Sequence, residues 1–136
     1  MRSTQRFARP ALLAALFAFQ GVIVPAEDAT FTVGTANATR GATAYGELKV
    51  PAGTDPALNI AIAVVNGAKP GPVVAFVAGS HGTEYASIVA LTRLTSRIDP
   101  KTLSGTVIVA PLLNVASFEQ MTVHLNPVDR KPMNGS

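Results

Sequence analysis

The chain has 136 residues, which leaves room for one domain, and its formal net charge is +3. Three arginines within residues 1–9 account for that excess, since residues 27–136 hold eight basic and eight acidic side chains. The charge therefore does not indicate a nucleic-acid surface, and aromatic residues, at 6%, are too few to support base stacking. Because the chain has no cysteine, it has no disulfide, and any metal must be held by His, Asp or Glu.

Residues 1–26 have the pattern of a secretory signal peptide. A basic start is followed by an apolar run at 11–19 and by small residues at 24–26. An uncleaved membrane anchor is the alternative, but the apolar run is shorter than a bilayer span needs. We therefore expect cleavage after residue 26. The mature chain, 27–136, is then expected to be exported, periplasmic or secreted, with no stable membrane anchor.

The first half of the mature chain predicts strands. Residues 31–33 fit a short strand, and 45–50 alternate in polarity as an edge strand does. Residues 58–66 are mostly apolar and rich in β-branched side chains, which predicts a more buried strand. Asn-Gly and Pro-Gly turn signals follow before the apolar strand 73–78, so these two strands are candidates for a hairpin.

A helix is predicted over residues 84–98, where apolar side chains recur at helical spacing. Thr83 is its expected N-cap, and an Asp-Pro pair ends it. A further buried strand at 106–111 completes a strand–helix–strand unit, which implies parallel strands within a mixed sheet. Ligands bind at the carboxyl ends of such strands, where residues 79–84 and Asn114 fall.

The motif Gly-Ser-His-Gly-Thr-Glu at residues 79–84 carries the most chemical information. Its His81 and Glu84 leave a strand end and enter a helix, so both side chains can converge on one point. Zinc binds imidazole nitrogen and carboxylate oxygen, and a catalytic zinc keeps one position open for water. Without a metal, His81 is a polar loop residue and Glu84 is a first-turn acid that the helix dipole favours. Two ligands make an incomplete site, so the metal interpretation requires a third ligand elsewhere.

Ser80 supports a different mechanism. Residues 78–82 form a variant of the G-x-S-x-G nucleophile elbow, with alanine in place of the first glycine. On that hypothesis the chain is a fragment of a serine α/β-hydrolase with Ser80 as the nucleophile. A third hypothesis is a non-catalytic, truncated exported protein.

Four segments together resemble the succinylglutamate desuccinylase/aspartoacylase family, whose members are deacylases related to the zinc carboxypeptidases. In order, they are NIAIAVVNGAKPGP from residue 59, VAFVAGSHGTE from 74, IDPKTLSGTVIVAPLLNVASF from 98 and NPVDRKPMN from 126. The resemblance covers about residues 45–134. It implies an α/β fold, namely part of a zinc-carboxypeptidase-like mixed sheet with flanking helices, truncated before the later strands.

The resemblance also implies a ligand set. His81 and Glu84 match two of the three family ligands of Zn²⁺, while the third, a His, and the general-base Glu are expected beyond Ser136. The family uses an Asn-Arg pair to hold the substrate carboxylate. Asn134 matches the Asn, and Gly135 stands where the Arg belongs.

Two further residues have open roles. Asn114 either contacts the substrate or caps the chain after a strand. His124 does not match the family ligand and is expected to be a solvated residue in the long loop predicted over 114–136. The resemblance implies zinc-dependent hydrolysis of the amide bond of an N-acyl amino acid, a small-molecule substrate. The 136-residue chain by itself is expected to be inactive.

Overall fold

A computed structural model describes residues 29–53 and 55–133, so the predicted signal peptide and Asn134 lie outside the described residues. The elements follow in the order β1 (Phe31–Val33), β2 (Ala36–Ala38), β3 (Ala42–Val50), β4 (Leu58–Asn66), β5 (Lys69–Val77), α1 (Tyr85–Thr95), β6 (Ser104–Ala110) and α2 (Val115–Glu119). In this part of the chain, neither helix has the length and apolar character needed to cross a membrane.

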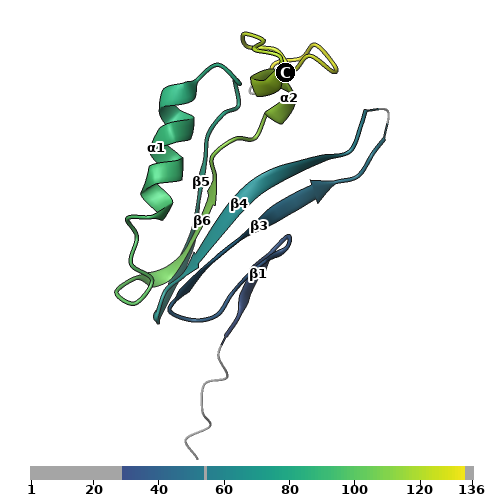
Figure 1. Cartoon of the computed structure of the whole chain (residues 1–136). Coiled ribbons are helices and arrows are strands. Elements are labelled where there is room, and N and C mark those ends of the chain that lie inside the picture. The colour runs from purple at the N-terminus through teal and green to yellow at the C-terminus, as the bar shows by residue number, and fades with distance from the viewer. Residues whose placement is uncertain (1–28, 54, 134–136) are drawn as a thin grey trace, which may run out of the picture.

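The main sheet has the strand order β3-β4-β6-β5. β4 pairs antiparallel with both β3 and β6, whereas β5 and β6 run parallel and are connected through α1. The predicted mixed sheet and its strand–helix–strand unit are therefore confirmed. Figure 1 shows α1 on one side of this sheet and the small antiparallel ribbon of β1 and β2 on the other.

The proposed hairpin between β4 and β5 is wrong, because β6 lies between them. Residues 66–72 do reverse the chain, but a turn signal does not decide which strand becomes the neighbour. β6 is buried at five of its seven residues, so it gains most from the central position, where both of its edges are paired. Which strand pairs with β4 therefore depends on β6, a segment some 40 residues further along the chain.

Alternating side chains of β4 build the two halves of the core. Ile62 and Val64 pack with the β1–β2 ribbon, while Ala63 and Val65 pack beneath α1 against Leu91 and other apolar side chains. All four β4 side chains are at most 4% exposed. The sheet is thus covered on both faces along residues 62–66 of β4, as the apolar composition of this strand predicted, whereas Asn59 and Ala61 in its first half are exposed.

The helices differ from the sequence predictions in three respects. The first helix, α1, ends at Thr95, before the predicted end at residue 98. The N-cap of α1 is Glu84, and the predicted cap Thr83 instead lies in the preceding turn, where its carbonyl accepts a hydrogen bond from the amide of Tyr85. α2 lies in the segment predicted to be a loop. Its N-cap Asn114 accepts a hydrogen bond from the amide of Ser117, and this local bond starts a helix too short for periodicity to reveal.

One edge of the sheet, β5, has no strand beyond it within the described part of the chain. All nine of its residues are exposed, among them Val73 at 53% and Val77 at 58%. Pro70 and Pro72 lack amide protons and protect the first half of the strand, but the second half offers an apolar edge with open hydrogen-bonding groups. This geometry predicts strand-to-strand association between copies of the 136-residue chain by itself.

We expect Val77→Lys to reduce concentration-dependent self-association at least severalfold, because a charge on an edge strand opposes pairing with a second edge. Sedimentation velocity over a concentration series measures the change. Gln120→Lys, which adds the same charge at an exposed position just after α2, is the matched control. If both variants reduced self-association equally, the reduction would be due to net charge, and a role for the β5 edge would be contradicted.

Candidate metal centre

The candidate centre begins at the turn that follows β5. Gly79 has a φ of +64°, and a Cβ there would come within 2.7 Å of Leu112, so glycine suits this position. The amide of Asn114 bonds to the Gly79 carbonyl at 2.9 Å, and the amide of Leu113 bonds to the Ala78 carbonyl at 3.0 Å. These bonds join the segment after β5 to the segment after β6 and fix the turn that carries His81.

His81 and Glu84 meet as the spacing predicted. The Nδ1 atom of His81 lies 3.0 Å from Oε1 of Glu84. The His81 side chain is 14% exposed, whereas that of Glu84 is 52% exposed. A largely buried imidazole thus lies beside a carboxylate that reaches solvent at the start of α1, where the helix dipole favours a negative charge.

Two buried polar residues, Asn114 and Ser117, hold the backbone of this turn. Asn114 is 3% exposed and donates from Nδ2 to the Ser80 carbonyl at 3.1 Å. Ser117 is fully buried, and its Oγ accepts the Gly82 amide at 3.0 Å. Both residues therefore hold the backbone on either side of His81. Sequence analysis missed Ser117, since a serine in a predicted loop gives no signal of burial.

The bonds of Asn114 give it a positioning role, because both ends of its side chain are engaged within the protein. Its proposed contact with the substrate stays a prediction. Asn134 and Gly135, which bear on the proposed carboxylate clamp, lie outside the described residues.

His124 is exposed, as expected of a loop residue, yet it lies against the candidate ligand pair. Its Nδ1 atom is 3.4 Å from Nδ1 of His81, and the two rings meet nearly edge to face, with centroids 4.7 Å apart and an interplanar angle of 86°. The separation of 43 residues gives no sequence signal for this contact. It arises because α2 turns the following loop back toward the end of β5.

The donor chemistry of the site fits a zinc ion in part. One imidazole nitrogen and one carboxylate oxygen are ligands of the types that zinc takes. Over residues 29–53 and 55–133, however, no group of three or more His, Cys, Asp or Glu side chains is arranged so that it would hold a metal ion. The structure therefore presents a candidate ligand pair with an adjacent imidazole.

The serine alternative gains no support from the geometry. The Nδ1 atoms of the two imidazoles face Glu84 and each other, and the hydrogen bond made by Ser80 runs from Asn114 to its backbone carbonyl. A nucleophilic serine needs a base within hydrogen-bond reach of its hydroxyl. The hydrogen bonds of the two Nδ1 atoms run to Glu84 and between the imidazoles, so they do not activate that hydroxyl.

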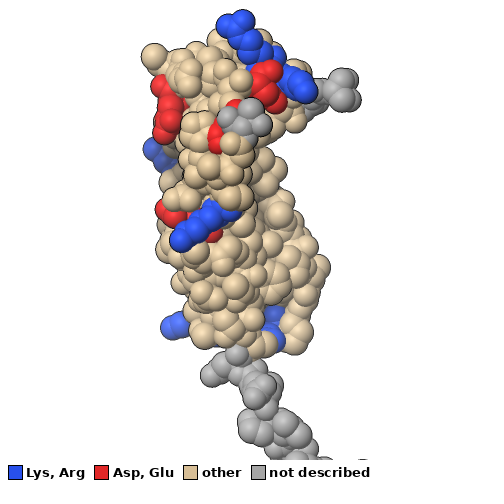
Figure 2. All heavy atoms as spheres, turned by 90° about the vertical axis from the view of Figure 1, so that its right-hand side faces the viewer, with Lys and Arg blue, Asp and Glu red and all other residues tan. Residues whose placement is uncertain are grey.

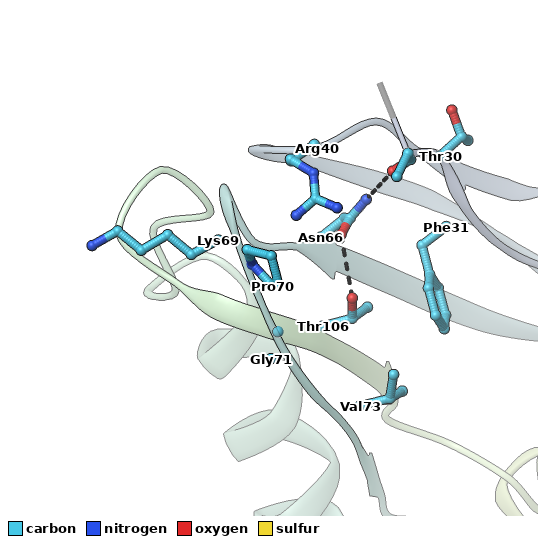
Figure 3. A pocket seen from close by; sticks show the side chains of 11 residues that line it. Thr30, Phe31, Arg40, Asn66, Lys69, Pro70, Gly71, Val73 and Thr106 are labelled. Carbon is cyan, nitrogen blue, oxygen red and sulfur yellow. Dashed lines mark hydrogen bonds between the residues drawn. The ribbon is translucent and has the colours of Figure 1, made fainter. Parts of the chain in front are cut away.

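A separate cavity of about 260 Å³ lies at the opposite end of the sheet, where β5 and β6 begin. Figure 3 shows Asn66 within it, hydrogen-bonded to Thr106 and to the backbone near Thr30. These bonds tie β4, β6 and the start of the described chain together, which identifies the buried Asn66 as a structural residue.

Figure 2 shows that charged side chains are sparse on the face toward the viewer and that most of them lie toward the end carrying α2.

Comparison with known proteins shows a similarity to one family. Residues 70–134 match the model of the succinylglutamate desuccinylase/aspartoacylase catalytic domain. Over this segment, nearly half of its length, the chain is similar to that family. A curated family relative, the N-alpha-acetyl-L-2,4-diaminobutyric acid deacetylase of Halomonas elongata, is 36% identical over 74 residues, which are 52% of this chain and 21% of the relative.

Solved structures agree with this family and with the fold. A succinylglutamate desuccinylase/aspartoacylase from Rhodobacter sphaeroides has a TM-score of 0.57 and 30% identity, covering 65% of this chain and 28% of that one. An aspartoacylase family protein from Mesorhizobium loti has a TM-score of 0.61 and 24% identity, covering 69% and 32%, and supports the fold alone. The chain thus spans about a fifth of the curated relative and about three tenths of each structure.

Proposed function

We propose that this chain is part of a succinylglutamate desuccinylase/aspartoacylase-type hydrolase, that it supplies His81 and Glu84 as zinc ligands, and that the hydrolase removes the acyl group from an N-acyl amino acid. The observation that carries the proposal is the 3.0 Å approach of His81 Nδ1 to Glu84 Oε1 at the carboxyl end of β5. The name of the Halomonas elongata relative, a deacetylase of an N-acetylated amino acid, supports this substrate class.

The residues of this chain have distinct tasks in the proposed site. When bound, zinc makes a coordinated water acidic and polarises an amide carbonyl. His81 presents its Nδ1 atom, and the hydrogen bonds of Asn114 and Ser117 hold the orientation of the turn that carries it. Glu84 contributes the negative charge that a dication requires, and its exposure leaves an open side for water and substrate.

The test compares loss of metal with loss of the serine hydroxyl in the protein that the complete gene encodes. A strong chelator is expected to abolish hydrolysis of N-acetyl amino acids, and added Zn²⁺ to restore it, because the metal supplies the activated water. Ser80→Ala is expected to retain most of the activity. Full activity in chelator together with an inactive Ser80→Ala variant would instead support the serine hydrolase.

We also propose export, on the basis of the signal-peptide pattern in residues 1–26. Expression with the native start and N-terminal sequencing of the product should place the mature N-terminus at Glu27, in the extracytoplasmic fraction. An intact Met1 on protein in the cytosolic fraction would contradict the proposal.

A further inference from the structure

The cavity at the opposite end of the sheet from the candidate metal centre has a positively charged lining. Its volume is about 260 Å³, and among the described residues that line it are two cations, Arg40 and Lys69, and no aspartate or glutamate. Asp99, in the connection before β6, does not line the cavity, and its carboxylate accepts a hydrogen bond from the Lys101 amide at 2.9 Å. The cavity therefore attracts small anions from solution.

Arg40 is fixed at the wall of this cavity by the tight turn between β2 and β3. The next residue, Gly41, has a φ of +74°, and its amide donates to the Asn66 carbonyl at 2.8 Å. Figure 3 shows the Arg40 side chain directed toward Asn66, whereas the Lys69 side chain extends outward. The backbone bond beside Arg40 thus holds a guanidinium over the cavity before any ligand arrives.

The guanidinium of Arg40 has no partner within the described part of the chain. Arg40 is partly buried, and over residues 29–53 and 55–133 it forms no hydrogen bond and no ion pair. Asn66, toward which it points, is already engaged, because its Nδ2 donates to two carbonyls and its Oδ1 accepts from the Thr106 hydroxyl at 3.2 Å. The five N–H donors of a guanidinium are therefore directed at open space beside a fixed wall.

We infer that this cavity binds a small oxyanion, a carboxylate or a phosphate group, on Arg40. The planar fork of a guanidinium matches two oxygens of either group, and a second positive charge on Lys69 draws the anion toward the cavity. A volume of about 260 Å³ is below the range of about 300–1,000 Å³ that is typical of drug-sized ligands, so the cavity suits a ligand of few non-hydrogen atoms. The inference does not depend on the proposed zinc chemistry, because these residues lie outside the turn between β5 and α1.

The test is a titration of the 136-residue chain with inorganic phosphate and, separately, with acetate. The ¹⁵N and ¹H resonances of the Arg40 Nε–H group report on the site, and sodium chloride at equal ionic strength gives the effect of salt alone. We expect a saturable shift with at least one of the two oxyanions and a Kd of about 10 mM or less, since a bidentate charged pair is stronger than a single contact. The anion with the lower Kd identifies the preferred class of ligand.

Arg40→Gln removes the charge and the fork, and should weaken binding about tenfold or more. Arg93→Gln makes the same change at an exposed position of α1, which covers the other face of the sheet, and should leave the affinity unchanged. Circular dichroism establishes that both variants are folded. An equal shift with chloride, or an equal loss of affinity in the two variants, would show a general effect of ionic strength or net charge and would overturn the site.

Discussion

Replacing His81 with alanine should lower the affinity of the chain for zinc by about a hundredfold or more. Structural zinc sites with four ligands are worth about 10–16 kcal/mol, so one ligand contributes about 3 kcal/mol, which corresponds to about a hundredfold in affinity. Glu84→Gln should weaken binding to a similar degree, because it keeps the shape of the side chain and removes the charge. Competition with a chromophoric chelator measures both losses.

The matched control is Glu47→Gln, which makes the same change of charge on β3, away from the turn between β5 and α1. It should bind zinc as the unchanged chain does. The Glu84 side chain is 52% exposed, so its replacement should cost little stability and the loss can be assigned to the metal. Equal losses in Glu84→Gln and Glu47→Gln would show a general electrostatic effect and would contradict ligation by Glu84.

Gly82→Ala should destabilise the whole domain and disturb the metal centre. A Cβ at Gly82 would overlap the backbone nitrogen of Phe118 and the carbonyl carbon of Ser117, and backbone atoms cannot move aside as a flexible side chain can. Such overpacking costs about 2–3 kcal/mol, which lowers the melting temperature of a domain of this size by about 10 °C or more. Thermal unfolding followed by circular dichroism measures the change.

Gly53→Ala is the control for this substitution, because a Cβ at Gly53 would meet no atom within 4 Å. It should leave the melting temperature within about 2 °C of the original, as surface substitutions usually do. If the Gly82→Ala variant had the same melting temperature as the Gly53→Ala variant, the contact between the His81 turn and α2 would be loose. The supporting role assigned to Ser117 would then be wrong.

Local patterns predicted most of the secondary structure. The apolar, β-branched run in β4 and the helical spacing of α1 are properties of neighbouring residues. β4 was found at the predicted residues, and α1 lies within the predicted range 84–98. The meeting of His81 and Glu84 was also predictable, since three residues across a strand-to-helix turn leave few arrangements.

What the sequence did not reveal depends on contacts between distant segments. The central place of β6 is decided by its pairing with β4 and β5 together, which no window of neighbouring residues contains. The approach of His124 to His81 requires α2, and α2 depends on the bond between Asn114 and the Ser117 amide. A five-residue helix gives no periodic signal, so the sequence revealed neither α2 nor the contact between His124 and His81 that depends on it.

The position of β6 has a consequence for how the chain is made. Residues 63–66 of β4 pair with residues 106–109, so the centre of the sheet is completed only after about 40 more residues have been synthesised. At about 5–20 residues per second, several seconds pass between the emergence of β5 and that of β6. During that time, the nascent chain presents two apolar strands whose final neighbour has not been translated. Translation speed and chaperone access therefore bear on the yield of this domain.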